Sequence, residues 1–457
     1  FTPDEKYILV AEVNRDQNHM HLNVYDSKTG KFVKTLFEEK NDKWVEPEHP
    51  AYFIGEGNDF IWMSEKDGFM NMYLVDFDRK ITEFVFEGKP MEVLQEGIKQ
   101  ITNHRFVVKD ILEVDVSNKL IYYAATGENP CNTMIYVTDL VGNSKTLSKY
   151  EGVHRFDLSD DGLYYYIGYS STTMPNHEMI YTTNGKMAKF LKESINPMNE
   201  YALGTVEINS IKGKDGSDLY YRMVKPSNFD PKNKYPVLVY VYGGPHAQMV
   251  TNSFNGGANL WMNWLAEQGY IVFTLDNRGS AERGFAFESQ IHRQLGTVEM
   301  EDQLTGVEYL KSLPYVDSER LAVHGWSFGG FMTTSLMLRH AGVFNVGVAG
   351  GPVTDWKFYE VMYGERYMDR PEENKEGYEA NALTNYTKNL TGKLLLIHGT
   401  VDDVVVMQHN YSLIKKFVED GKQMDFFPYP MHKHNVTGKD RAHLMEKILT
   451  YVIENNQ

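Results

Sequence analysis

After about residue 205, short apolar strands alternate with helical segments, and this alternation constrains the fold more than any other feature. The strands are hydrophobic almost throughout, which is typical of strands buried on both faces in a parallel sheet covered by helices. The five clearest are 236–242, 270–275, 321–324, 346–349 and 394–398. Near the C-terminus, Leu444, Ile448 and Val452 share one stripe of a helix expected at 439–454. Residues 201–457 therefore predict one α/β domain.

Residues 1–200 show a different pattern, in which aromatic and β-branched runs are separated by Gly, Asp and Asn turns. A weak motif recurs around Tyr25, Tyr73, Tyr136 and Tyr181, at intervals of 48, 63 and 45 residues. Intervals near 45, one of them lengthened by an insertion around 88–105, favour the blades of a β-propeller. An irregular β-sandwich is the alternative. The polar stretch around Pro197 is interpreted as the linker between the two domains.

Charge and cysteine content exclude several classes of protein. The net charge of −16 argues against nucleic acid or an anionic membrane surface as the main partner. The single cysteine, Cys131, excludes an internal disulfide framework and a cysteine-based metal site. The sequence contains no apolar run of about eighteen residues, so we expect no membrane-spanning helix. We also find no metal, nucleotide or haem spacing, and predict no cofactor.

The strongest local signal for chemistry is Gly-Trp-Ser-Phe-Gly-Gly around Ser327, between a predicted strand and a helical segment. The pattern G-x-S-x-G in a strand-to-helix turn is a nucleophile elbow, which exposes the serine hydroxyl at the end of the strand. A serine needs a base, and the base needs a carboxylate that orients it. Candidates follow in the expected order, first Asp402 and Asp403 after one strand, then His432 and His434 after another. The residue types alone do not decide which aspartate is the acid and which histidine is the base.

An acyl transfer also needs two donors for the oxyanion. The backbone N–H of Phe328 is one by its position after the nucleophile. The phenol of Tyr242, after the strand at 236–242, is a candidate for the other. The alternative interpretation of Tyr242 is a buried strand tyrosine. His324 and His398 also end strands beside the site, and we expect them to support it or to fill the core rather than to bind metal.

Several motifs of residues 201–457 together resemble the prolyl oligopeptidase family of serine peptidases, dipeptidyl peptidase IV branch: GWSFGG, VYGGPHAQ, DNRGS, PVTDWKFYEVMYGERYM, and HGTVDD with a downstream histidine. The resemblance implies an α/β-hydrolase catalytic domain at 201–457. It also implies that residues 1–200 are the C-terminal part of a truncated β-propeller. The chain starts at Phe1 without a leader, so we expect a preceding segment that holds the rest of the amine-binding site.

Matched to the family, Ser327 is the nucleophile, Asp402 the acid, His434 the base and Tyr242 the side-chain oxyanion donor. The resemblance also implies an apolar S1 pocket that receives proline, with Phe328 beside it. Its residues are Val353, Trp356, Tyr359, Tyr363 and Val405. Aromatic and β-branched walls suit a flat, rigid ring. Ordinary core packing is the alternative, above all for Trp356.

Two positions depart from dipeptidyl peptidase IV proper. Val404 stands where that enzyme has an asparagine, and Glu360 stands where the branch usually has aspartate. Both features resemble the bacterial prolyl tripeptidyl peptidase subgroup, which implies release of Xaa-Xaa-Pro tripeptides, with Glu360 near the substrate's amine. Glu360 as a helix-surface charge is the alternative. The resemblance implies peptide substrates with a free N-terminus and proline at the cleavage site, a periplasmic or secreted location, and a possible homodimer.

Three other functions stay open at this point. A dipeptidyl peptidase would release Xaa-Pro dipeptides instead. An acylaminoacyl peptidase or an esterase would not require a free amine. A propeller interaction module with an inactive hydrolase domain would have no catalysis at all.

Overall fold

The computed structural model describes residues 1–78, 82–86, 89–93 and 97–457; between 79 and 96 only the backbone of two strands is described. The chain divides into two compact units. The first contains residues 1–195 together with 251–254 and 282–286, and the second contains 196–250, 255–281 and 287–457. The division between 195 and 196 lies within the polar stretch around Pro197. The two short segments from the second half of the sequence that join the first unit were not predicted.

The first unit is built from antiparallel sheets, which follow one another along the chain. A three-stranded sheet contains β1 (Tyr7–Val13), β2 (His19–Asp26) and β3 (Phe32–Lys40). The next contains β4 (Tyr52–Phe53), β5 (Phe60–Ser64), β6 (Asn71–Val75) and β9 (Ile98–Gln100). A third contains β10 (Val108–Asp115), β11 (Leu120–Ala125), β12 (Met134–Asp139) and β13 (Lys145–Thr146). The fourth contains β14 (Val153–Leu158), β15 (Tyr164–Ser171), β16 (Met174–Thr182) and β17 (Met187–Glu193).

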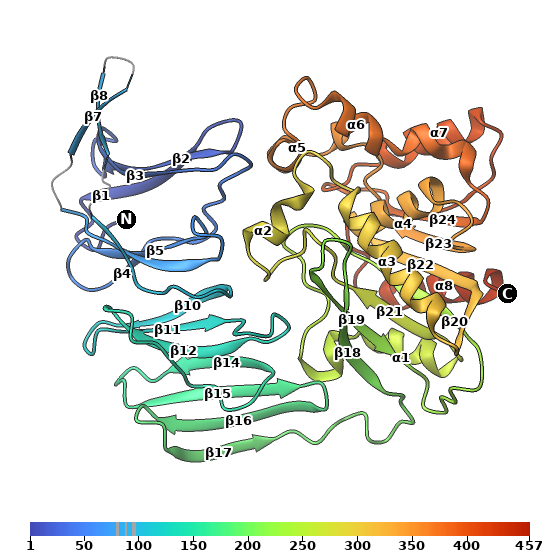
Figure 1. Ribbon diagram of the computed structural model, residues 1–457, viewed down its shortest axis with the longest axis horizontal. Helices are drawn as coiled ribbons and strands as arrows, with labels where there is room; N and C mark the ends of the chain where they lie inside the picture. The colour runs from blue at the N-terminus through green and yellow to red at the C-terminus, as the bar shows by residue number, and fades with distance from the viewer. Residues whose placement is uncertain (79–81, 87–88, 94–96) are drawn as a thin grey trace. The chain divides into compact units, whose positions relative to one another are not determined.

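These sheets pack face to face in series, as Figure 1 shows for the blue to green strands. Successive side chains of a strand point to opposite faces, so one strand supplies two cores. In β5, Phe60 and Trp62 pack toward the first sheet, whereas Ile61 and Met63 pack toward the third. The inner sheets are thus buried on both faces, which agrees with the predicted propeller blades and excludes a sandwich of two sheets.

The recurring tyrosine motif lies on β6, β12 and β16, the third strands of the four-stranded sheets, and on β2 of the three-stranded one. The long interval after Tyr73 contains a separate hairpin of β7 (Thr82–Phe86) and β8 (Lys89–Val93) between β6 and β9. The insertion therefore begins earlier than the predicted 88–105. Of that range, residues 88 and 94–96 lie outside the described residues.

The second unit contains a mixed sheet of eight strands in the order β18-β19-β21-β20-β22-β23-β24-β25. From β21 to β25 the neighbours pair in parallel, whereas β19 pairs antiparallel with β18 and β21. The strands are β18 (Val206–Lys212), β19 (Asp218–Val224), β20 (Tyr235–Tyr240), β21 (Ile271–Leu275), β22 (Val316–Trp326), β23 (Val346–Gly350), β24 (Lys393–Gly399) and β25 (Asp425–Tyr429). All five predicted strands are present, which confirms the α/β-hydrolase prediction.

Helices connect these strands, and several of them pack on the two faces of the sheet (Figure 1). They are α1 (Leu260–Glu267), α2 (Phe285–Glu288), α3 (Val298–Ser312), α4 (Phe328–Arg339), α5 (Val361–Met368), α6 (Lys375–Asn381), α7 (Gln408–Glu419) and α8 (Asp440–Asn455). Short 3₁₀ turns are η1 (Phe254–Gly257), η2 (Ser289–Ile291), η3 (Trp356–Phe358) and η4 (Leu383–Asn389). The predicted terminal helix is present as α8. Across the described part of the chain, we find no helix with the length and apolar character needed to cross a membrane.

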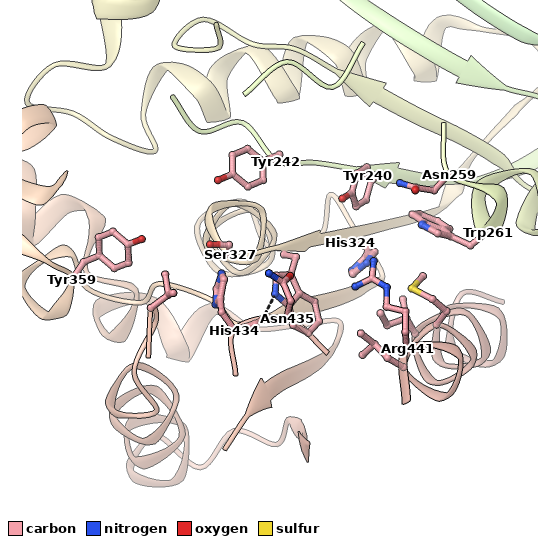
Figure 2. Close-up of a pocket in the computed structure, with 15 residues that line it drawn as sticks. Tyr240, Tyr242, Asn259, Trp261, His324, Ser327, Tyr359, His434, Asn435 and Arg441 are labelled. Carbon is pink, nitrogen blue, oxygen red and sulfur yellow. Dashed lines mark hydrogen bonds between the residues drawn. The ribbon is translucent and has the colours of Figure 1, made fainter. Parts of the chain in front are cut away.

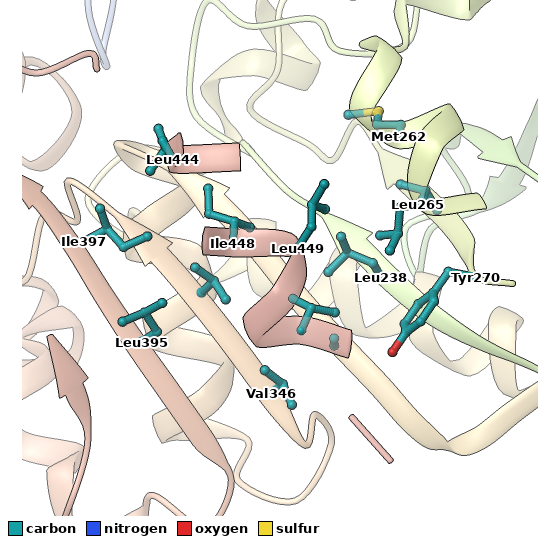
Figure 3. Close-up of a cluster of buried hydrophobic side chains, with 14 of the residues drawn as sticks. Leu238, Met262, Leu265, Tyr270, Val346, Leu395, Ile397, Leu444, Ile448 and Leu449 are labelled. Atoms are coloured by element: carbon teal, nitrogen blue, oxygen red, sulfur yellow. The ribbon is translucent and has the colours of Figure 1, made fainter. Parts of the chain in front are cut away.

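The main core of the second unit lies between the sheet and helices α1 and α8 (Figure 3). The predicted stripe of α8, Leu444, Ile448 and Val452, is buried there. On the opposite face, a Cβ added at Gly347 would lie 2.6 Å from the Met337 side chain, so α4 packs directly on β23. This packing holds the C-terminal ends of the parallel strands in fixed positions, and the candidate site lies at that edge.

Candidate active site

Ser327 occupies a strained turn between β22 and α4. Its backbone angles are φ 61° and ψ −118°, in a region that non-glycine residues rarely adopt, and its N–H donates to the carbonyl of Gly350 at 2.8 Å. A Cβ at Gly325 or at Gly329 would come within 2.3 or 2.2 Å of the Val241 carbonyl oxygen. The two glycines therefore let the turn approach β20 closely, which is the backbone geometry of a nucleophile elbow.

Asp402 and His434 are brought together although 32 residues separate them in the sequence. Asp402 follows β24 and His434 follows β25, and the ends of parallel strands meet at one edge of a sheet. Nδ1 of His434 lies 2.8 Å from Oδ2 of Asp402. With Nδ1 donating to the carboxylate, Nε2 is the nitrogen left to receive a proton.

The carboxylate of Asp402 is held by several donors. Oδ1 accepts from the N–H groups of Val404 and Val405 at 2.9 Å each, and Oδ2 lies 3.2 Å from Nε2 of His398. Burial opposes ionisation of Asp402, but hydrogen bonds from His398, His434 and Val404 outweigh it and hold its pKa well below the ordinary value. Nδ1 of His398 lies 2.9 Å from the Asn410 amide. Asp402 is thus a fixed, ionised partner for His434.

The neighbouring candidates from the sequence have other partners. Asp403 is exposed and pairs with Lys433 at 2.6 Å. His432 pairs with Asp440 at 2.7 Å. Of the four possible combinations, the structure therefore joins Asp402 to His434.

The loop that carries His434 is anchored beside the elbow. The indole N–H of Trp326 donates to the His434 carbonyl oxygen at 2.9 Å. A Cβ at Gly351 would lie 3.2 Å from Cε1 of the His434 ring, and Gly351 has a φ of +46°. Trp326 and Gly351 thus determine where the imidazole lies, and neither was predicted as a site residue. The glycine pair at the end of β23, Gly350 and Gly351, was a signal that sequence inspection could have used.

The predicted oxyanion donors lie on adjacent elements. Phe328 is the first residue of α4, so the helix itself offers no partner for its N–H. Tyr242 follows β20, and its ring centroid is 6.2 Å from that of Phe328. Burial raises the pKa of Tyr242, which keeps its hydroxyl protonated, and that hydroxyl has no hydrogen-bond partner within the described residues. The turn is fixed by Asn277, whose amide donates to the Gly243 carbonyl at 2.9 Å.

The predicted S1 residues form one aromatic cluster around Trp356. Its ring centroid lies 5.4 Å from Phe328, 5.7 Å from Tyr359 and 5.9 Å from Tyr363. Val353, Trp356 and Val405 are buried, whereas Tyr359 and Tyr363 are half-buried. The structure therefore brings the aromatic residues of this set together beside the elbow.

A cavity of about 420 Å³ opens on Ser327 and His434 (Figure 2). Of the other predicted site residues, Tyr242 and Tyr359 line it, and so does Val404. The predicted residues that are not among its lining residues are Phe328, Val353, Trp356, Glu360, Tyr363, Asp402 and Val405. The cavity extends instead toward residues that were not predicted: Tyr240, Asn259, Trp261, Asn435, Arg441 and Met445.

Glu360 serves as the N-cap of α5. Its carboxylate accepts from the N–H groups of Met362 at 3.0 Å and Tyr363 at 2.9 Å. This contact explains why a carboxylate suits the first turn of the helix. Glu360 is exposed and directly follows Tyr359, which lines the cavity. The capping bonds leave lone pairs on both oxygens for a further donor.

Comparisons with known families match both units. Residues 258–457 match the prolyl oligopeptidase family, and residues 1–176 match the dipeptidyl peptidase IV (DPP IV) N-terminal region. Dipeptidyl peptidase 8 of Mus musculus is 29% identical over 490 residues, covering 99% of this chain and 54% of that protein. Probable dipeptidyl-aminopeptidase B of Arthroderma otae is 31% identical, and the match covers 94% of this chain and 47% of that protein. The chain thus spans about half the length of the curated relatives it matches.

Solved structures show the same similarity. A crystal structure of a Bacteroides ovatus protein, described as a dipeptidyl aminopeptidase IV, is 44% identical in sequence and has a TM-score of 0.93. The match covers 100% of this chain and 65% of that one. Dipeptidyl peptidase 4 of Porphyromonas gingivalis is 30% identical with a TM-score of 0.88, covering 98% of this chain and 62% of that one.

Proposed function

Because the chain belongs to the prolyl oligopeptidase family, in its dipeptidyl peptidase IV branch, we propose that it is the catalytic part of a serine exopeptidase that cleaves peptides after proline. The observation that carries the proposal is the 2.8 Å contact of buried Asp402 with His434, which lines one cavity together with Ser327 on its elbow. An inactive interaction module would have no need to keep a buried carboxylate ionised beside that histidine.

In the proposed reaction, Nε2 of His434 takes the proton of the Ser327 hydroxyl as Oγ attacks the carbonyl carbon of the proline residue. The N–H of Phe328 and the hydroxyl of Tyr242 donate to the oxyanion that forms. The proton then passes from His434 to the leaving nitrogen as the C–N bond breaks. Water attacks the acyl-enzyme by the same proton route, which releases the acid and restores Ser327. Asp402 stays ionised and stabilises the imidazolium.

The finer proposal is release of Xaa-Xaa-Pro tripeptides. It is supported by Glu360, whose carboxylate caps the N-terminus of α5 beside the aromatic cluster. A protonated substrate amine that reached Glu360 would have its distance to Ser327 fixed, and that distance would set the number of residues released. Release of Xaa-Pro dipeptides is the second candidate, because the matched relatives are named dipeptidyl peptidases.

The experiment compares Ala-Ala-Pro and Ala-Pro amides of a fluorogenic amine, each with a free and an acetylated N-terminus. We expect cleavage of the free Ala-Ala-Pro amide and loss of cleavage on acetylation. Preference for the free Ala-Pro amide would overturn the tripeptide proposal in favour of dipeptide release. Equal cleavage of acetylated substrates would favour an acylaminoacyl peptidase or an esterase. A homodimer and a periplasmic or secreted location remain proposals that rest on family resemblance.

A further inference from the structure

The cavity beside Ser327 continues past the catalytic residues to a second set of side chains. In Figure 2, Tyr359 lies on one side of Ser327, and Arg441 lies on the other with Trp261 and Asn259. The wall of the cavity on the Arg441 side carries aromatic rings and side-chain amides. It is formed by Tyr240, Asn259, Trp261, Trp326, Asn435 and Arg441.

The far end of the cavity carries the positive charge of Arg441. Arg441 is the lining residue with a permanent charge, and no Asp or Glu lines the cavity. In the part of the chain that the structure describes, Arg441 has no ion pair. His324, also in the wall, is buried with its Nδ1 2.8 Å from the Val348 carbonyl oxygen. Burial and the nearby Arg441 lower the pKa of His324 to about 4, so the ring is neutral at pH 7.

An unpaired guanidinium facing a cavity suits an anion, and its planar fork matches a carboxylate. This is notable in a chain with a net charge of −16, where acidic partners for an arginine are abundant. Aromatic rings from Trp261 and Tyr240 supply apolar walls on the path between Ser327 and Arg441. A peptide segment with a carboxylate at its end has the required chemistry.

From this arrangement we infer that Arg441 binds a carboxylate of the leaving peptide. The inference rests on the proposed function, in which the acyl part of the substrate, with its proline, lies toward Tyr359. The leaving part then extends from Ser327 in the opposite direction, toward Arg441. The carboxylate is the free C-terminus of a short leaving peptide or an acidic side chain close to the cut. Arg441 thus determines specificity on the leaving side.

The test compares Arg441→Gln with wild type on four substrates. They are Ala-Ala-Pro-Leu-Leu as the free acid, the same peptide amidated, amidated Ala-Ala-Pro-Leu-Glu, and the aminomethylcoumarin amide of Ala-Ala-Pro. We expect kcat/KM of the free acid or of the glutamate peptide to fall about tenfold or more, the factor that a charged hydrogen bond supplies. The coumarin amide has no carboxylate in its leaving group, so its kcat/KM should not change. Lys439→Gln, which removes an equal charge outside the cavity, is the matched control.

The four substrates also separate the possible outcomes. If kcat/KM falls for the free acid alone, Arg441 binds the C-terminal carboxylate of the leaving peptide. If kcat/KM falls for the glutamate peptide alone, Arg441 binds an acidic side chain of that peptide. Equal loss on the coumarin amide would show a structural effect and overturn the inference, as would unchanged cleavage of every substrate. If wild type cleaves none of the four, the proposed tripeptide release fails, whatever Arg441 does, and the same comparison is made on substrates shortened to begin Ala-Pro.

An independent cluster lies in the first unit, on the sheet of β1, β2 and β3. His19 and His21 are two residues apart on β2 and therefore share one face, and Glu38 of β3 pairs with His21. Oε2 of Glu38 lies 2.6 Å from Nε2 of His19 and 3.5 Å from Nε2 of His21. The three ligand atoms all lie within 4.8 Å of one another, and all three side chains are half-buried. Glu12 of β1 pairs with His21 from the other side.

This geometry points to a divalent transition-metal site, with zinc as the ion whose ligand preferences fit best. Two imidazole nitrogens and one carboxylate are a zinc ligand set that leaves one position for water or for Glu12. Lys40 also contacts Glu38, at 3.4 Å, but its side chain is 56% exposed and is free to turn into solvent when an ion binds. The sequence prediction of no metal site did not consider residues that strand pairing brings together.

Calorimetric titration of the full chain with zinc tests the site without any peptidase assay. Wild type should bind one equivalent and unfold at a higher temperature with zinc, and His19→Ala/His21→Ala should lose both effects. His177→Ala, on β16 of the same unit, is the control and should leave both unchanged. Equal binding by the double variant, or no binding by wild type, would overturn the site. Unfolding of the zinc-free double variant near the wild-type temperature establishes that its fold is intact.

Discussion

Nδ1 of His434 lies 2.8 Å from Oδ2 of Asp402, and the same carboxylate oxygen lies 3.2 Å from Nε2 of His398. Asp402 therefore orients the histidine while a second imidazole and two backbone N–H groups orient Asp402 itself. Removal of the charge, with the shape retained, should affect the reaction far more than the fold.

Asp402→Asn should lower kcat on an Ala-Ala-Pro amide by about 10⁴-fold with little change in KM. An asparagine presents a donor to the imidazole, favours the wrong tautomer and cannot stabilise the imidazolium. Steady-state kinetics measure the loss. Asp403→Asn removes the same charge one residue further on, from a side chain that pairs with Lys433. Equal losses in the two variants would contradict the assignment.

His434→Ala should abolish most activity, and His432→Ala should leave kcat within a few-fold of wild type. Of these two histidines, His434 contacts Asp402, whereas His432 pairs with Asp440 near the start of α8. The loss for His434→Ala should be about 10⁴-fold or larger, because the nucleophile then has no base. A fully active His434→Ala variant would exclude the proposed reaction.

Tyr242→Phe should lower kcat by about 10²–10³-fold, the cost of one oxyanion donor. The phenyl ring keeps its packing against Phe328, and the lost hydroxyl has no partner within the described part of the chain. The temperature of unfolding should therefore stay the same, which thermal denaturation can check. A raised KM with unchanged kcat would instead assign Tyr242 to substrate binding.

Glu360→Gln separates the helix cap from the substrate contact. The glutamine oxygen still accepts from backbone N–H groups, but the charge that would hold an amine is lost. We expect kcat/KM for the free Ala-Ala-Pro amide to fall about tenfold, with the temperature of unfolding unchanged. Glu360→Ala should lose the cap as well and cost about 1 kcal/mol of stability. Glu376→Gln, exposed on α6, is the control. Unchanged kinetics for Glu360→Gln would restrict Glu360 to its structural role.

Glu299 should make stability depend on pH in a predictable direction. It is fully buried in the first turn of α3, where its two oxygens accept from the Gly296 N–H at 2.9 Å each. Burial raises the pKa of Glu299 to about 8. A raised pKa in the folded state gives stability that is complete below the unfolded value, about 4.3, and is lost as pH rises toward 8.

Glu299→Gln removes that dependence. The stability of wild type relative to Glu299→Gln should therefore fall between pH 5 and pH 8, as measured by chemical denaturation at both values. Glu301, two residues on, contacts Lys214 and Arg278, and these bonds lower its pKa. The difference in stability between wild type and Glu301→Gln should be the same at both pH values. If the difference in stability between wild type and Glu299→Gln were the same at pH 5 and at pH 8, Glu299 would not be buried in its neutral form.

The fold was largely predictable because its signals are local. Apolar runs mark β20 to β24, and the stripe of Leu444, Ile448 and Val452 marks α8. The strand β22 starts at Val316, before the predicted 321, because Val316 pairs with Tyr235; the pairing with β20 is irregular across the polar residues 317–320 and becomes regular at Leu321. Residues 251–254 and 282–286 join the first unit through non-local contacts, such as the 2.7 Å bond from Asn252 N–H to the Cys131 carbonyl. No local pattern reports such contacts.

The candidate site was predictable in its residue types but less so in its geometry. Asp402 and Asp403 are adjacent, and the direction of a turn decides which of them meets His434. That direction depends on the Val404 and Val405 N–H groups that fix the carboxylate. The anchoring of His434 by Trp326 and Gly351 depends on contacts between separate strands. Arg441 carries no motif, and only its place in the cavity singles it out.

The most direct test of the central claim is labelling of the full chain with a fluorophosphonate, followed by peptide mapping. Such probes react with a serine that a neighbouring base activates. The account predicts one adduct, on Ser327, which Asp402→Asn slows strongly and Asp403→Asn does not. An adduct on another serine, or none on Ser327 in a protein that unfolds cooperatively, would contradict it.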